Sequence, residues 1–219
     1  MSSPAESYRK HYDADRAARY AATKDRSTRA NRAEGALVVR AFRHVPEGAT
    51  VLDAPCGSGR MSVKLARMGY RVAAADVSPP MVELARARFL AEGLAIPAEA
   101  RDLEASGYPD RAFDAVFCFR LFHHFPSEAL RDGVARELCR VAGRFVLASY
   151  LDARSFTCRK RAWQARRRGR APGKHPETPG AMAARFERCG FLPVADLARF
   201  PLLHSLRILV AERRPTAGS

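Results

Sequence analysis

The ten residues from Val51 to Arg60, VLDAPCGSGR, constrain the fold more than any other segment of the chain. A short apolar, β-prone run ends at the acid Asp53, a turn carrying Gly57 and Gly59 follows, and a helical pattern begins directly afterwards. Glycines permit positive φ and let the backbone approach a ligand closely. The segment therefore predicts a buried strand joined by a tight turn to a helix. Plain structural turns, phosphate sites and dinucleotide sites all use such turns, so the surroundings must decide its role.

The rest of the chain alternates short β-prone runs with helical patterns. We expect strands at residues 50–54, 71–75, 97–101, 113–119, 144–150, 191–198 and 205–213. We expect helices within residues 5–45 and at residues 61–67, 78–90, 126–141 and 179–189. This alternation predicts an α/β fold with a mostly parallel sheet covered by helices on both faces. No helical pattern separates the last two strands, which favours an antiparallel final strand.

The length of 219 residues suits one domain. We expect a helical lid over residues 1–45, the main domain over residues 46–214 and a frayed tail over residues 215–219. No apolar run approaches the roughly 18 residues of a membrane span, and the polar N-terminus does not resemble a secretory signal. These features predict a cytoplasmic protein. Five cysteines, an odd number without a CxxC pair, favour neither a disulfide framework nor a zinc site, and we expect no metal.

The net charge is +15, and most of the excess comes from arginine. Either the composition is biased towards arginine throughout, or the protein meets an anionic partner. The basic segment at residues 154–175 contains Phe156 and Trp163 as apolar anchors among its cations. Through residues 159–170 it could contact an anionic membrane surface at the inner membrane face, or RNA. The alternative is a solvated and partly disordered loop, because runs of charge usually face water.

Three acids follow three successive predicted strands. Asp53 precedes the glycines, Asp76 ends the next strand, and Asp102 follows the third. Carboxylates at this edge can accept hydrogen bonds from ribose hydroxyls and from an adenine amino group. They would repel a pyrophosphate, which disfavours a nicotinamide-dependent oxidoreductase. The pattern predicts a nucleoside ligand with a positively charged end near Asp53.

These segments resemble the motifs of the class I S-adenosylmethionine (SAM)-dependent methyltransferases, particularly the ubiquinone/menaquinone group. The four matching segments are VLDAPCGSGR, RVAAADVSPPMVELAR, ARDLE and FDAVFCFRLFHHF, in that order. The resemblance spans about Tyr12 to Tyr150 and implies the strand order 3-2-1-4-5-7-6 with strand 7 antiparallel. It implies that SAM is held by Asp53, Ala54, Gly57, Gly59, Arg60, Asp76, Val77, Met81, Asp102, Leu103, Phe119 and Arg120. One departure is Pro55, which replaces a glycine of the family pattern and offers no N–H there.

The resemblance also implies direct attack of a substrate atom on the SAM methyl group, for which a general base helps where that atom carries a proton. His123 and His124 are candidate bases, although either could simply pack or cap the following helix. Tyr12 and Tyr20 could touch the substrate from the lid or pack as ordinary helix residues, and Tyr150 is a third candidate substrate contact. We expect a small-molecule or lipid-like acceptor. The alternatives are an RNA or protein substrate steered by the basic segment, or a SAM-binding protein without catalysis.

Overall fold

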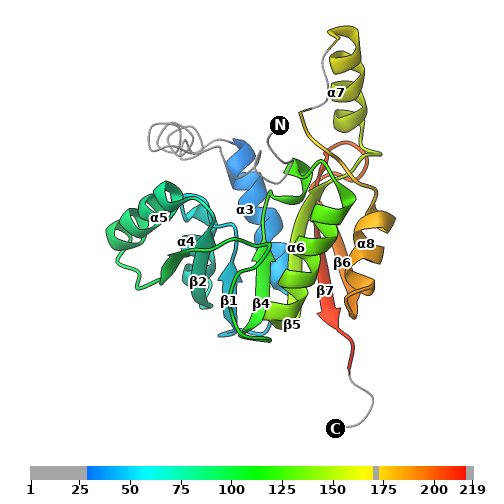
Figure 1. The fold of residues 1–219 in the computed structure, drawn as a ribbon. Coiled ribbons are helices and arrows are strands. Elements are labelled where there is room, and N and C mark those ends of the chain that lie inside the picture. Colours follow the sequence, from blue (N-terminus) through cyan, green and yellow to red (C-terminus); the bar gives the residue numbers. More distant parts are fainter. Residues whose placement is uncertain (1–28, 170–172, 216–219) are drawn as a thin grey trace, which may run out of the picture.

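The computed structural model describes residues 29–169 and 173–215 and contains a seven-stranded sheet (Figure 1). Its strands are β1 (Thr50–Asp53), β2 (Arg71–Asp76), β3 (Ala98–Ala100), β4 (Phe113–Cys118), β5 (Ala142–Leu151), β6 (Phe191–Ala198) and β7 (Leu206–Arg213). They lie in the order β3-β2-β1-β4-β5-β7-β6. The first five strands are parallel, and β7 runs antiparallel to both β5 and β6. The expected fold class and strand order are confirmed.

The helices of the described residues are α3 (Arg29–Phe42), α4 (Arg60–Arg67), α5 (Pro79–Ala91), α6 (Glu128–Val141), α7 (Phe156–Arg167) and α8 (Pro179–Glu187), with a 3-10 turn, η1 (Phe122–His124). Four of them begin at a hydroxyl side chain that accepts a backbone N–H three residues later, which satisfies one donor of the first turn. These capping residues are Ser78, Ser127, Ser155 and Thr178. α5 and α8 also have proline in the first turn, where the missing N–H costs nothing.

Alternate strand residues pack against different helices, because successive side chains of a strand point to opposite faces. Val51 and Phe117 pack with α3 and α4 on one face, where Leu37 is one of the buried helix residues. Leu52 and Val116 pack with α6 and α8 on the other face. Figure 1 shows the sheet between these helical layers, with α7 standing beyond the end where the parallel strands finish. The basic segment at residues 154–175, expected to be either a contact surface or a solvated loop, is largely helical because it contains α7.

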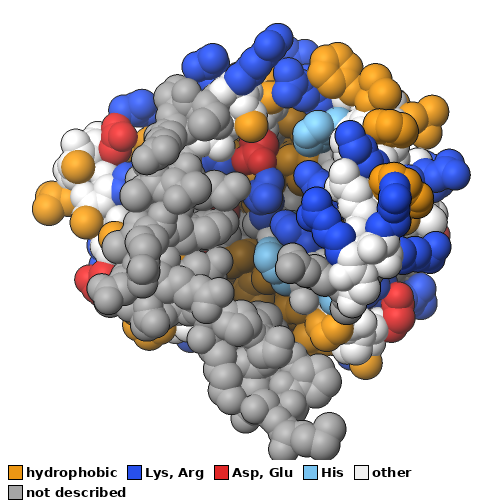
Figure 2. Space-filling model, turned by 90° about the horizontal axis from the view of Figure 1, so that it is seen from above, with side chains coloured by type: hydrophobic (Ala, Val, Ile, Leu, Met, Phe, Trp, Pro, Cys, Tyr) orange, Lys and Arg blue, Asp and Glu red, His pale blue; other side chains and the backbone are white. Residues whose placement is uncertain are grey.

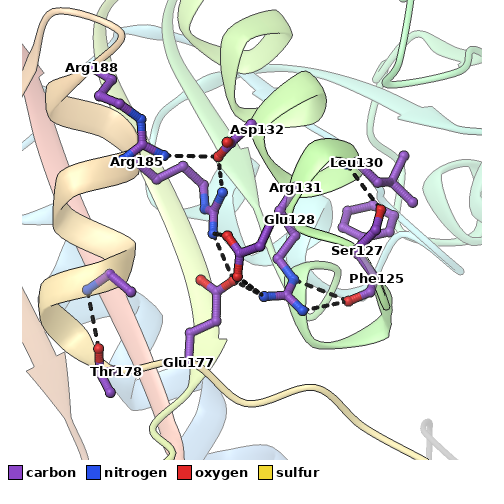
Figure 3. A network of polar contacts seen from close by, with 11 residues as sticks. Phe125, Ser127, Glu128, Leu130, Arg131, Asp132, Glu177, Thr178, Arg185 and Arg188 are labelled. Carbon is purple, nitrogen blue, oxygen red and sulfur yellow. Dashed lines mark hydrogen bonds and ion pairs between the residues drawn. The ribbon is translucent and has the colours of Figure 1, made fainter.

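A buried ion network fixes α8 against α6 (Figure 3). Glu177, 6% exposed, accepts from Arg131 at 2.5 Å and from Arg185 at 2.9 Å. Arg185 is 2% exposed and also pairs with Glu128 and Asp132. Two guanidinium groups thus share one buried carboxylate, which joins the segment after α7 to the start of α6.

Tyr150 lies in this same layer rather than at an open surface. Its side chain is 1% exposed, and its hydroxyl donates to Asp196 of β6 at 2.8 Å. Burial raises the pKa of Tyr150, and the hydrogen bond to Asp196 raises it further. The structure therefore gives Tyr150 a partner on β6, and its contact with a substrate stays a prediction.

Among the described residues, no helix is long and apolar enough to cross a bilayer.

Candidate functional site

The glycine turn after β1 is held by the end of β2. The Cys56 N–H donates to the Ala75 carbonyl of β2 at 2.8 Å, and the Gly57 N–H donates to Asp76 Oδ2 at 2.9 Å. Gly57 and Gly59 have φ of 53° and 76°, a region that favours glycine. A Cβ at Gly59 would lie 2.5 Å from the Phe89 ring, whereas a Cβ at Gly57 would meet nothing within 4 Å. Gly59 is thus required by the packing of α5, and open space lies beside Gly57.

Asp53, at the end of β1, is the most constrained acid of the site. Its side chain is 1% exposed, and its Oδ2 accepts from the Ser62 hydroxyl at 2.6 Å. Its Oδ1 is buried and has no hydrogen-bond partner among the described residues. Burial raises the pKa of Asp53 to about 7, with nearby Asp76 raising it and Ser62 and Arg60 lowering it. A buried acceptor oxygen without a hydrogen-bond partner suits a positively charged donor of a ligand.

Asp76 ends β2 and organises the backbone around it. Besides holding Gly57, it accepts the Ser78 N–H at 3.0 Å with Oδ1. Burial raises its pKa, against the lowering effect of these backbone bonds. Each carboxylate oxygen has a second lone pair, so Asp76 can still accept hydrogen bonds from a ligand.

Asp102 lies two residues beyond β3, is partly buried and accepts the Glu104 N–H at 3.0 Å. Because β3, β2 and β1 are neighbours in the sheet, the three acids follow adjacent strands along one edge. Figure 2 looks onto this edge and shows a hollow with an apolar floor, with arginines and lysines gathered on one side of it.

Two arginines next to the glycine turn and β4 meet one carboxylate of α3. Glu34 accepts from Arg60 at 2.9 Å with Oε2 and from Arg120 at 2.5 Å with Oε1. Arg120 lies two residues after the end of β4. Its backbone φ of 64° is uncommon for a residue other than glycine. Its N–H donates to the Ser149 hydroxyl of β5 at 2.6 Å, which helps to hold that conformation. The strained backbone and the shared anion make Arg120 a candidate ligand residue.

The other predicted cofactor residues lie in or beside this region. Ala54, Met81, Leu103 and Phe119 are each at most 8% exposed, and Val77 is partly buried. Phe119 stacks on Phe117 with ring centroids 5.5 Å apart. These residues can supply apolar walls, while the acids and arginines supply the polar contacts.

The two histidine side chains differ in their exposure to solvent. His123 is 1% exposed in η1, whereas His124 is exposed. Their rings lie 4.3 Å apart between centroids, and the His123 carbonyl accepts the His175 N–H at 2.9 Å. The spacing of the sequence does not choose between them, but the structure gives only His124 an exposed side chain. Tyr12 and Tyr20 lie outside the described residues.

Three residues that make contacts in this site are not among the site residues predicted from the sequence. They are Glu34 on α3, Ser62 on α4 and Ser149 on β5. Glu34 is 26 residues from Arg60 and 86 residues from Arg120, so no local motif marks it. Ser62 lies three residues after Gly59, and its place on the first turn of a helix is the one signal that could have identified it.

Part of this chain is similar in sequence to known methyltransferases. Residues 51–143 match the family model described as a methyltransferase domain. The ubiquinone biosynthesis O-methyltransferase of Xanthomonas axonopodis pv. citri (strain 306) is 31% identical over 105 residues, which cover 48% of this chain and 44% of that protein. The protein of the same name from Xylella fastidiosa (strain 9a5c) is 32% identical over 109 residues, covering 49% and 44%. The chain thus matches less than half the length of these relatives.

Solved structures share the fold at lower identity. The magnesium protoporphyrin IX methyltransferase of Synechocystis PCC 6803, solved with bound S-adenosylhomocysteine (SAH), is 22% identical and has a TM-score of 0.70. The match covers 84% of this chain and 82% of that one. The 1,6-didemethyltoxoflavin-N1-methyltransferase of Burkholderia thailandensis is 17% identical, with a TM-score of 0.69 and coverage of 98% and 92%. Residues 51–143 thus match a methyltransferase domain, and the strand order 3-2-1-4-5-7-6 is the one expected from the resemblance to the class I SAM-dependent methyltransferases.

Proposed function

We propose that this chain binds SAM and transfers its methyl group to a small-molecule or lipid-like acceptor. The observation that carries the proposal is the row of acids along one sheet edge, with a buried Asp53 oxygen that lacks a partner among the described residues. SAM combines a nucleoside with an ammonium and a sulfonium group. Its hydroxyl and amino donors and its positive charges suit carboxylates that are already desolvated.

In this proposal each acid has a separate task. Asp53 faces the cationic end of SAM, Asp76 accepts from the ribose hydroxyls, and Asp102 accepts from the adenine amino group. The remaining contacts come from the glycine turn and from the apolar and basic residues around it. These are Ala54, Gly57, Gly59, Arg60, Val77, Met81, Leu103, Phe119 and Arg120.

The protein's contribution to the reaction would be alignment and exclusion of water, since bound SAM supplies an activated methyl group. The buried walls at Phe119 and Leu103 can exclude water on the cofactor side. The named relatives support a small acceptor, because the solved neighbours act on magnesium protoporphyrin IX and 1,6-didemethyltoxoflavin. The curated relatives are named for ubiquinone biosynthesis, which supports a lipid-like one.

The proposal can be tested with methyl-labelled SAM and fractionated cell extract. Label entering small molecules or lipids would support it. Label in RNA or protein would favour the second candidate, for which the arginines of α7 are the favouring observation. Tight binding of S-adenosylhomocysteine (SAH) without transfer to any fraction would favour a non-catalytic SAM-binding protein. Failure of the purified chain to bind SAH would contradict all three.

The histidine pair gives a second test on whichever acceptor is found. His123→Ala and His124→Ala should leave SAH affinity nearly unchanged, while the variant that removes the base should slow turnover roughly 10²-fold or more. The measurement is the single-turnover rate against pH, which loses one limb when a base is removed. Wild-type rates in both variants would show that neither residue is a base.

The place of the protein in the cell follows from the same surfaces. We propose a cytoplasmic protein in which residues 159–170 contact an anionic partner. A membrane surface and RNA are the two partners that the sequence leaves open.

A further inference from the structure

The exposed large apolar side chains of this protein are concentrated in one place. The described residues expose eight of them, and five belong to α7 or to the loop between β6 and β7. These five are Phe156 (61% exposed), Trp163 (56%), Phe200 (52%), Leu202 (63%) and Leu203 (62%). Single exposed apolar residues are ordinary, but a cluster marks an interaction surface.

The two segments form one continuous surface. The Phe156 N–H donates to the Leu202 carbonyl at 2.6 Å, and the Thr157 N–H donates to the Leu203 carbonyl at 3.4 Å. We call residues 154–169 and 199–204 together the α7–loop face. Figure 1 shows this face at the carboxyl end of the parallel strands, which is the edge that carries the site.

The α7–loop face is basic and contains no acidic residue. Its cations are Arg154, Arg159, Lys160, Arg161, Arg166, Arg167, Arg168 and Arg199. Arg167 lies over the Trp163 ring at 4.7 Å, and Arg199 lies over the Phe200 ring at 5.1 Å. Burial lowers the pKa of His204, and the positive charges of Arg199 and Arg161 lower it further.

An arginine-lined groove adjoins the face through Arg199. It has a volume of about 360 Å³ and is open to solvent. Its lining is four arginines around a small apolar floor, namely Arg29, Arg32, Arg40 and Arg199 with Ala33, Ala36 and Leu37. Guanidinium groups bind phosphate through several N–H donors, and the floor suits the apolar part of the same ligand.

The combination favours a lipid surface over the other anionic partners. RNA-binding surfaces pair cations with aromatic rings that stack on bases. The side chains of exposed leucines such as Leu202 and Leu203 cannot stack on bases. They bury apolar area when they enter the boundary between lipid headgroups and acyl chains. The arginines of the same face are attracted to anionic headgroups.

We propose that the α7–loop face docks this protein on an anionic bilayer, with Leu202, Leu203, Phe156 and Trp163 entering the interface and the arginines binding lipid phosphates. The inference extends the proposed function, since docking would turn the site edge towards a lipid-borne acceptor. The docking itself depends on neither SAM binding nor catalysis.

The experiment uses the full chain with vesicles of phosphatidylcholine, with and without phosphatidylglycerol. Trp163 is the chain's one tryptophan, so its fluorescence reports directly on α7. We expect co-sedimentation with the anionic vesicles and a blue shift of the emission, with little of either on neutral vesicles. Sedimentation without a blue shift, or no sedimentation, would overturn the proposal. Binding of an RNA oligomer in preference to anionic vesicles would also overturn it.

Two variants separate the apolar and the basic contributions. Leu202 has φ of 66°, so Leu202→Gly removes the side chain without requiring a new backbone conformation. Together with Leu203→Ser it should weaken vesicle binding roughly tenfold or more. Replacing Arg166, Arg167 and Arg168 by Ser should weaken it roughly 30- to 100-fold and reduce its salt dependence. Wild-type binding by both variants would contradict the proposal.

A matched control is available on α5. Leu90 is 83% exposed and lies outside the α7–loop face, so Leu90→Ser should bind vesicles as the wild type does. SAH affinity is measured on every variant and should not change. A chain that binds vesicles but not SAH would contradict the proposed function alone, and one that binds SAH but not anionic vesicles would contradict this inference alone.

Discussion

At the scale of single residues, the fold changes the chemistry of Asp53. Its carboxyl group ends a buried strand, its Oδ2 is held by Ser62, and its Oδ1 has no partner among the described residues. Desolvation makes the charged form costly, which is why the pKa is raised to about 7. A ligand cation beside Oδ1 would reverse this by favouring the charged form.

The first prediction concerns the pH dependence of ligand binding. Below pH 7 the free protein carries protonated Asp53, so binding of the SAH ammonium group must release a proton. SAH affinity should therefore fall by up to about tenfold for each pH unit below 7. Calorimetry in buffers of different ionisation enthalpy measures this proton release. In Asp53→Asn the affinity should be weaker and nearly independent of pH over the same range.

The same group makes a prediction for stability without ligand. The folded protein binds more protons at Asp53 than the unfolded chain does between pH 3.8, the ordinary value, and about 7. Wild-type stability relative to Asp53→Asn should therefore decrease as the pH rises through this window and stay constant above it. Urea unfolding at several pH values checks it, and an increase with pH would contradict the raised pKa.

Arg120 allows a prediction about which part of the cofactor it meets. It and Arg60 share Glu34, and a carboxylate of the ligand would find the same two guanidinium groups. Arg120→Met should weaken SAH binding by about 1.5–3 kcal/mol, the usual range for a hydrogen bond to a charged group. Binding of 5′-methylthioadenosine, which lacks the amino-acid end, should not change. Equal losses for both ligands would assign Arg120 to the fold instead.

At the scale of elements, α8 is attached to the domain through charge as well as apolar packing. Glu177 lies before α8 and is the buried carboxylate that pairs with both Arg131 of α6 and Arg185 of α8 (Figure 3). Removing one partner of such a buried group leaves an uncompensated charge, which costs more than the net gain of forming the pair.

We therefore expect Glu177→Gln to destabilise the protein by about 3 kcal/mol or more. The matched control is Glu212→Gln, which breaks the exposed pair between Glu212 and Arg144 and should cost at most about 1 kcal/mol. Urea unfolding of both variants at one pH gives the comparison. Similar losses in the two variants would mean that the buried network contributes no more than a surface pair.

At the scale of the whole molecule, the site joins elements that are distant in the sequence. Glu34 brings α3 to the glycine turn and to the end of β4, and Asp76 connects that turn to the start of α5. A ligand that contacts these groups binds the folded chain and not the unfolded one, so it should stabilise the whole domain.

SAH at about 100 times its Kd should therefore add about 2.7 kcal/mol of stability. For a chain of this size that corresponds to a rise in Tm of roughly 5–10 °C. Differential scanning calorimetry measures it, and Asp76→Asn should show a smaller rise at the same SAH concentration. A Tm that does not respond to SAH would contradict the proposed cofactor.

The sequence alone determined the succession of strands and most helices, although not α7, and the place of the acids. Strand and helix periodicity marks each segment locally, and parallel strands carry their carboxyl ends to one edge, so Asp53, Asp76 and Asp102 could be placed there without coordinates. Tyr150 shows a limit of this reasoning, since its hydroxyl donates to Asp196 of β6. Nothing local could indicate that partner, which is 46 residues away.

The tertiary structure alone decided which side chains meet. It buries His123 while leaving His124 exposed, leaves one Asp53 oxygen without a protein partner among the described residues, and brings Glu34 to two arginines. It also places the loop at residues 199–204 beside α7. These contacts depend on how distant segments pack across the sheet, and a side chain's burial and partners are set by that packing rather than by its sequence neighbours.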